Sequence, residues 1–324
     1  MRDEILEFLR KNKGSFTSGQ SMSEACQVSR TAVWKHIEVL RSKGYKIESF
    51  TKRGYRLLEE PDLVSPLEME DILTTETFGR TYEYIERTES TNREARRSAE
   101  EGTPEGTVVI TEEQVAGRGR LNRGWFSPYA KGLWFSVVLR PTFPPIEAPK
   151  CTLMAAVALI KAFRELGLTT AGIKWPNDIM VHGRKLVGIL TEMSGSMEAI
   201  DYIVMGIGIN ISSQLKDFPE ELQSIGTSFA VEGVQVDRRH ALDVILRCLE
   251  TQYKKVCTEG FDSTLEEWKL YSITLNKDVT VKAPGEDYIG HAVDLDRDGN
   301  LIVERADNGQ VERVVAGDVS IRPV

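Results

Sequence analysis

The spacing of hydrophobic positions in the first 60 residues predicts three helices followed by a two-stranded hairpin. The third helix carries Val33, Ile37 and Leu40 at helical spacing, which gives it one apolar stripe. Ser29 precedes this helix as a predicted N-cap. The predicted elements are helices over 2–11, 18–26 and 29–42 and strands over 45–50 and 54–58.

Beyond a linker bracketed by Pro61 and Pro66, helices and strands alternate, and from residue 272 only short strands with turn signals follow. We therefore expect a multidomain α+β protein with a central α/β domain and a small C-terminal β-barrel. The predicted strands of the central domain are 108–111, 133–139, 185–192 and 202–211, and its long helices are 150–166 and 238–259. The predicted domains are 1–64, 65–271 and 272–324.

Charge is unevenly distributed along the chain. Residues 1–60 hold 12 Lys and Arg against 8 Asp and Glu, whereas the remainder holds 29 against 41, in a protein with a net charge of −8. A basic end on an acidic body points to a nucleic-acid-binding module at that end. Three helices and a basic hairpin are the elements of a winged helix-turn-helix, so the first domain is predicted to have this fold.

Composition excludes several other classes of protein. No apolar run approaches the ~18 residues of a membrane span, and the N-terminus lacks the apolar core of a signal peptide, so a cytoplasmic protein is expected. The 4 cysteines form no CxxC pair, and the 4 histidines are scattered. Neither a zinc site nor a disulfide framework is therefore predicted.

The segment 117–125, Gly-Arg-Gly-Arg-Leu-Asn-Arg-Gly-Trp, carries the most specific chemistry of the sequence. Its glycines let backbone N–H groups approach an anion, and its three arginines are forked donors suited to phosphate or carboxylate. Trp125 adds an aromatic face for a planar ring. No Gly-Lys-Ser/Thr closes a phosphate-binding loop here, and Asn122 stands where GxGxxG requires glycine. A solvated basic loop is the alternative interpretation of these residues alone.

A second candidate is Lys174-Trp-Pro-Asn-Asp178, which precedes a strand that Lys185 opens. A lone cation at the start of an apolar strand requires an anionic partner. The segment 206–210, Gly-Ile-Gly-Ile-Asn, and the triplet 90–92, Ser-Thr-Asn, are weaker signals. Packing glycines and a helix N-cap explain these two segments equally well when each is taken alone.

Together these segments resemble the bacterial bifunctional biotin–protein ligases that also repress the biotin operon. The resemblance extends over essentially the whole chain, from the winged helix to a C-terminal segment ending Gly-Asp-Val-Ser-Ile-Arg. The glycine-arginine loop followed by Lys-Trp-Pro-Asn-Asp is its most specific part. One departure is Leu121, where some members of the family carry a further arginine.

The resemblance implies a central domain related to class II aminoacyl-tRNA synthetases and an SH3-like C-terminal barrel. It implies that biotin reacts with ATP, accompanied by Mg²⁺, to give biotinyl-5′-adenylate, and that a lysine of a biotin carboxyl carrier domain then takes the biotinyl group. It also implies that the adenylate-bound form dimerises, binds operator DNA and represses biotin genes.

The resemblance assigns residues to each task. Asp178 is expected either to bind Mg²⁺ or to orient the acceptor lysine. The expected catalytic residues are Lys185, Arg118, Arg120 and Asp178. Biotin binding is assigned to Ser90, Thr91, Asn92, Gln114, Arg118, Gly119, Arg120, Lys185 and Gly188, and ATP or adenylate binding to Arg120, Arg123, Trp125, Asn177 and Asn210. The candidates for DNA contact are Gln20, Ser29, Thr31, Lys35, Lys52 and Arg53.

Three alternatives have sequence features that discriminate them. A lipoate–protein ligase would share the fold but usually lacks the winged helix and the full glycine-arginine loop. A repressor with a dead ligase centre is disfavoured because Arg118, Arg120, Asp178 and Lys185 are all present. A ligase that has lost repression is disfavoured, less strongly, by the intact basic wing.

Overall fold

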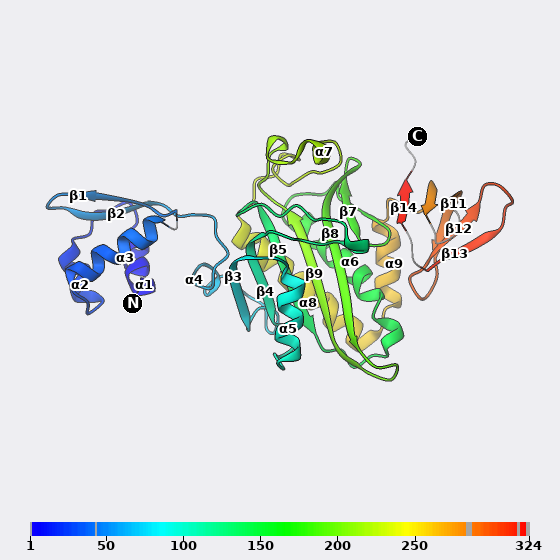
Figure 1. Cartoon of the computed structure of the whole chain (residues 1–324), viewed down its shortest axis with the longest axis horizontal. Helices are drawn as coiled ribbons and strands as arrows, with labels where there is room; N and C mark the ends of the chain where they lie inside the picture. The colour runs from blue at the N-terminus through cyan, green and yellow to red at the C-terminus, as the bar shows by residue number, and fades with distance from the viewer. Residues whose placement is uncertain (1, 43, 283–286, 316–317, 322–324) are drawn as a thin grey trace. The chain divides into compact units, whose positions relative to one another are not determined.

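The computed structural model describes residues 2–42, 44–282, 287–315 and 318–321 (Figure 1). The chain divides into two compact units, Met1–Leu63 and Val64–Val324. The boundary falls between Pro61 and Pro66, the two prolines that bracket the predicted linker.

The first unit is a three-helix module with a two-stranded antiparallel wing. Its predicted apolar stripe is confirmed, because Val33, Ile37 and Leu40 are all buried. Ser29 accepts a hydrogen bond from the backbone N–H of Ala32, as expected of an N-cap. The elements are α1 (Arg2–Lys11), α2 (Gly19–Ala25), α3 (Arg30–Ser42), β1 (Lys46–Phe50) and β2 (Gly54–Glu59).

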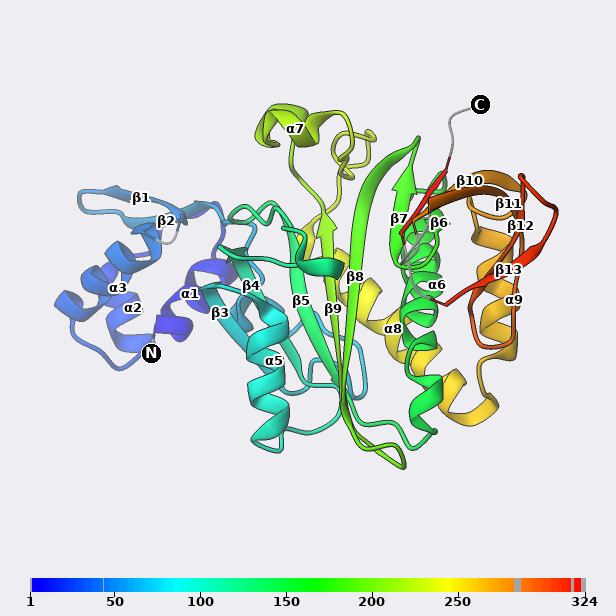
Figure 2. The same cartoon turned by 45° about the vertical axis from the view of Figure 1, so that its right-hand side comes forward.

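The second unit is built on a seven-stranded mixed sheet (Figure 2). Its first two strands are parallel and are joined by α5 (Thr91–Glu100), whereas the other neighbours are antiparallel. In spatial order the strands are β3 (Tyr82–Thr88), β4 (Val108–Gln114), β5 (Gly132–Leu139), β9 (Ile200–Asn210), β8 (Arg184–Gly195), β7 (Asp178–Val181) and β6 (Gly172–Lys174).

Helices cover both faces of this sheet, and each face has its own core. On one face Ala95 and Ala99 of α5 pack with Val109, Val138 and Val204. The larger core lies on the opposite face, which Figures 1 and 2 show covered by α6 (Lys150–Glu165) and α8 (Arg238–Glu259), with α9 (Asp262–Tyr271) beside α6. The short helices are α4 (Pro66–Met69), α7 (Glu220–Gln223), η1 (Arg120–Asn122), η2 (Pro145–Glu147) and η3 (Leu215–Asp217). None of the described helices is long and apolar enough to cross a membrane.

The C-terminal segment forms a five-stranded antiparallel sheet, which confirms its predicted β-structure. Asp296 closes the turn between the second and third of its strands by accepting backbone hydrogen bonds from Asp298 and Asn300. The spatial order is β13 (Val311–Val314), β12 (Leu301–Arg305), β11 (Asp287–Leu295), β10 (Lys277–Lys282) and β14 (Asp318–Ile321).

A fully buried ion pair joins α8 to the sheet. Arg238 and Glu112 lie 2.8 Å apart, and neither side chain is exposed to solvent. Arg238 also donates to the carbonyl of Gly132 at 2.9 Å, and the other Glu112 oxygen accepts from the backbone N–H of Val64 at 2.9 Å. Buried charges are tolerated when they are paired and hydrogen-bonded in this way.

Replacing Arg238 by methionine is expected to lower the free energy of unfolding of the second unit by about 3–5 kcal/mol, because Glu112 is left buried and unpaired. Arg247→Met on the same helix is the matched control. Arg247 pairs with Glu165 at the surface, so its loss should cost at most about 1 kcal/mol. Urea unfolding followed by tryptophan fluorescence measures both, and equal losses would contradict the prediction.

Candidate active site

Two glycines of β9 leave the α5 face of the sheet open to close contact. A Cβ at Gly208 would lie 2.2 Å from the indole nitrogen of Trp125, and one at Gly206 would lie 1.9 Å from the side-chain oxygen of Asn92. Both side chains therefore rest directly on the strand backbone, which only glycine permits at such distances. The glycines of segment 206–210 are thus packing glycines that place two candidate site residues.

The glycine-arginine loop is closed at its base and exposed at its tip. The N–H of Trp125 donates to the carbonyl of Gly117 at 2.8 Å, and the N–H of Gly119 donates to the carbonyl of Arg123, also at 2.8 Å. At the tip Leu121 has a φ of 55° and is 72% exposed. The loop is therefore anchored on the sheet through its last residue.

The anionic partner expected for Lys185 is Asp178. The Lys185 Nζ lies 2.7 Å from a carboxylate oxygen of Asp178 and 5.2 Å from the ring centre of Trp125. Asn177 donates to the carbonyl of Ile189 at 2.9 Å and accepts from Arg120 at 3.3 Å. Lys185 of β8, Asn177 before β7 and Arg120 of the glycine-arginine loop therefore lie close together.

The N-terminus of α5 is held by a side chain from β4. Gln114 accepts from the backbone N–H of Thr91 at 2.9 Å and donates to the hydroxyl of Ser127, also at 2.9 Å. Ser90 occupies the N-cap position but makes no capping hydrogen bond with its side chain. Ser90 of the triplet 90–92 is thus the N-cap residue of α5, but the side chain that accepts a backbone N–H at this end of the helix is that of Gln114.

Asn92 links α5 to two strands. Its amide nitrogen donates to the carbonyl of Leu190 at 3.2 Å and to Glu192 at 2.8 Å, and its oxygen accepts from Ser136 at 2.7 Å. Arg96 donates to the other Glu192 oxygen at 2.6 Å. Sequence reasoning missed Ser136 and Glu192, although a serine inside the apolar strand 133–139 was a usable signal.

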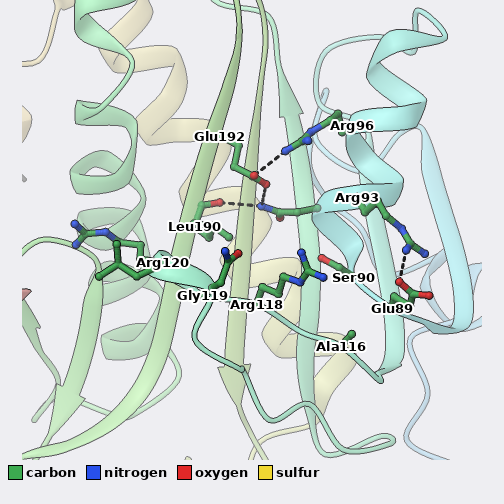
Figure 3. Close-up of a pocket in the computed structure, with 13 residues that line it drawn as sticks. Glu89, Ser90, Arg93, Arg96, Ala116, Arg118, Gly119, Arg120, Leu190 and Glu192 are labelled. Carbon is green, nitrogen blue, oxygen red and sulfur yellow. Dashed lines mark hydrogen bonds and ion pairs between the residues drawn. The ribbon is translucent and has the colours of Figure 1, made fainter.

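These elements surround a pocket of about 430 Å³, and a smaller pocket of about 100 Å³ adjoins it. In Figure 3, Arg96 reaches Glu192 and Arg93 reaches Glu89, whereas Arg118 extends toward Ser90. The predicted ligand-site residues that line the smaller pocket are Ser90, Thr91, Asn92, Gln114, Arg118, Gly119, Arg120, Arg123, Trp125, Asn177, Asp178, Lys185 and Gly188.

Asn210 is the predicted residue that the structure does not bring to these pockets. It is 4% exposed at the end of β9, and its amide donates to the carbonyl of Thr227 at 2.9 Å. Its contact with an adenylate stays a prediction, whereas its bond to Thr227 is part of the structure.

The first unit presents a second, separate surface. A hollow of about 670 Å³ lies between the start of α2, α3 and the wing, and three of the DNA-contact candidates, Gln20, Thr31 and Lys52, line it. Ser29, Lys35 and Arg53 are exposed but are not among its walls. Sequence reasoning missed Arg30 and the half-exposed Trp34, which line the hollow from the same helix.

Comparison with known proteins identifies the family. The chain is 37% identical over 322 residues to the bifunctional ligase/repressor BirA of Bacillus subtilis, a match that covers 99% of this chain and 98% of the relative. The chain belongs to the BirA family. The BirA of Escherichia coli K12 is 29% identical over 310 residues, covering 95% of this chain and 94% of that protein.

Family profiles match three parts of this BirA-family chain. They are an HTH domain over residues 2–56, the biotin/lipoate A/B protein ligase family over 84–210 and the biotin protein ligase C-terminal domain over 274–322. Among solved structures, the biotin protein ligase from Aquifex aeolicus in complex with biotin and ATP has a TM-score of 0.64 at 25% identity. That match covers 76% of this chain and 100% of the other.

Gly208→Ala is expected to displace Trp125 and release the base of the glycine-arginine loop. Overpacking of this kind costs about 1–3 kcal/mol, which raises the open population of the loop by roughly 5- to 150-fold. Trypsin should therefore cleave faster after Arg118, Arg120 and Arg123. Gly124→Ala is the matched control, since a Cβ there has no neighbour within 4 Å. Equal cleavage of the two variants in folded protein would show that Gly208 does not anchor the loop.

Proposed function

We propose that this chain activates biotin with ATP and transfers the biotinyl group to a lysine of a biotin carboxyl carrier domain. The observation that carries the proposal is the convergence of Lys185, Arg118, Arg120 and Arg123 on one pocket. A carboxylate that attacks a phosphate must overcome repulsion between two anions, and preorganised cations reduce this repulsion where charge develops. Membership of the BirA family supports the same activity.

In the first step a biotin carboxylate oxygen attacks the α-phosphorus of ATP, and the bond to pyrophosphate breaks. Lys185 and Arg118 would hold the attacking carboxylate and the α-phosphate. Arg120 would stabilise the negative charge that develops between these two groups during the attack. Biotin would bind among Ser90, Thr91, Asn92, Gln114, Gly119 and Gly188, and the adenylate would extend toward Arg123, Trp125, Asn177 and Asn210.

In the second step the amine of the carrier lysine attacks the carbonyl carbon of the mixed anhydride, and AMP leaves. Asp178 is the carboxylate that lines the same pocket as Lys185, and it would orient this amine or bind Mg²⁺. The described residues contain no group of three His, Cys, Asp or Glu side chains that could hold a metal. A single carboxylate such as Asp178 is enough for an Mg²⁺ ion that enters the pocket bound to the phosphates of ATP. There the ion would neutralise phosphate charge.

The first unit would bind operator DNA of biotin genes as one half of a homodimer. The hollow lined by Gln20, Thr31 and Lys52 borders α3 and the wing, the two elements that contact DNA in winged helices. One such unit makes few phosphate contacts, so a second copy would supply the remainder. ATP, biotin, carrier protein and operator meet in the cytoplasm, which is the compartment we propose.

Lys185→Ala is expected to abolish biotin-dependent exchange of pyrophosphate into ATP while the protein stays folded. The reason is loss of the cation nearest to Asp178 in a reaction between anions. Lys216→Ala, an exposed lysine of η3, is the control and should exchange like the unaltered protein. Lipoate is tested in parallel with biotin. Exchange that depends on lipoate and not on biotin would overturn the substrate assignment. Normal biotin-dependent exchange by the Lys185→Ala variant would overturn the role of Lys185.

Removing residues 1–63 is expected to abolish binding to an operator selected from random duplex DNA, while carrier biotinylation persists. The two units are separately compact, and the basic charge lies in the first. In the full chain, biotin plus ATP should strengthen DNA binding, because the adenylate is expected to promote the dimer that holds the operator. This coupling is reciprocal in free energy. Gel shift and carrier labelling measure the two activities. DNA binding that ignores biotin plus ATP would contradict the switch, and an inactive but folded truncation would contradict the separation of tasks.

A further inference from the structure

The backbone of Lys185 is bonded to a segment about forty residues further along the chain. Its N–H donates to the carbonyl of Ile225 at 2.7 Å, and its carbonyl accepts from the N–H of Thr227 at 3.0 Å. These two bonds form a short parallel bridge between Lys185 and Gly226. The position of the lysine backbone therefore depends on where residues 225–227 lie.

Glu232 holds both sides of this bridge. Its carboxylate is 5% exposed and accepts from Arg184 at 2.9 Å and from the hydroxyl of Thr227 at 2.5 Å, and it lies 2.9 Å from His182 Nδ1. Burial opposes ionisation of Glu232, but hydrogen bonds from Thr227 and His182 and the charge of Arg184 outweigh it and lower the pKa of the carboxyl. The buried carboxylate of Glu232 thus links Arg184, which precedes Lys185, to Thr227, which is bonded to the Lys185 backbone.

Thr227 is bonded through every polar group it has. Its N–H donates to Lys185, its carbonyl accepts from Asn210 and its hydroxyl donates to Glu232, in a residue that is fully buried. The bond from Asn210 connects the end of β9 to the same network. The side chains of Asn210, Thr227 and Glu232 therefore hold in place the segment that is bonded to the backbone of Lys185.

We propose that Glu232 is a positioning residue for the amine of Lys185. Glu232 is not among the residues that line the two pockets, so it would act through Thr227 and Arg184 and not through a ligand. This inference rests on the proposed function, in which the Lys185 amine must align two anions. Displacement of a reacting group by about 1 Å costs up to roughly 100-fold in rate.

The first test measures the position of the amine without any substrate. Lys185 is labelled with acetic anhydride in the folded full chain, and its modification rate is read by mass spectrometry. Glu232→Ala should raise this rate several-fold, because the amine leaves Asp178 when the bridge loosens, and Glu232→Gln should raise it less, since glutamine keeps the shape and one acceptor. Glu221→Ala, an exposed glutamate of α7 in the same segment, is the matched control and should label like the unaltered chain.

The second test measures the chemistry. In biotin-dependent pyrophosphate exchange, Glu232→Ala should lower kcat by about 10- to 100-fold with little change in KM for ATP. Glu232→Gln should lie between Glu232→Ala and the unaltered chain.

The outcomes separate the two proposals. Unchanged labelling of Lys185 in both Glu232 variants, or an unchanged kcat in Glu232→Ala, would overturn the positioning role. If Glu232→Ala does not fold, Glu232→Gln decides by the same two measurements. If the unaltered chain shows no biotin-dependent exchange, the proposed function fails, while the labelling rates still decide whether Glu232 positions the amine.

Discussion

The second unit depends on one buried ion pair, between Glu112 in β4 and Arg238 at the start of α8. Neither charge reaches water, so each must find its partners inside the protein. Those partners come from four places in the chain, namely β4, β5, α8 and residue Val64. The pair therefore disfavours arrangements that separate these elements, since each of them would leave a buried charge without compensation.

This arrangement has a direct consequence for the pocket. Glu112 and Gln114 are two residues apart on β4, so fixing the first also fixes the strand from which the second reaches α5. The backbone of β9 then has to accept side chains from both α5 and the glycine-arginine loop. It does so because Gly206 and Gly208 have no Cβ to oppose Asn92 and Trp125. The two glycines of β9 therefore leave the space in which the pocket forms on that face.

The charges of the pocket are balanced unevenly. Lys185 is paired with Asp178, and Arg96 with Glu192, so these cations are neutralised within the protein. The residues that line the two pockets include six Lys and Arg side chains against three Asp and Glu, and three of the arginines lie on a loop whose glycines permit motion. A pocket with this excess of positive charge favours anionic ligands over neutral ones of the same shape. The acidic charge of the second unit as a whole does not alter this local field, because distant surface charges are screened.

Local pattern determined much of this protein. The three helices and wing of the first unit follow from periodicity within about 60 residues, and the partner requirement of Lys185 follows from a cation in an apolar strand. Thirteen of the residues that the motif resemblance named line the smaller pocket, whereas Glu232, which does not line it, was not among the candidates. Tertiary structure alone decided the pairing of Glu112 with Arg238, which are 126 residues apart. It also decided that Glu232 and Asn210 meet at Thr227. Such contacts leave no periodic trace in sequence, because their geometry arises only when the sheet brings distant strands together.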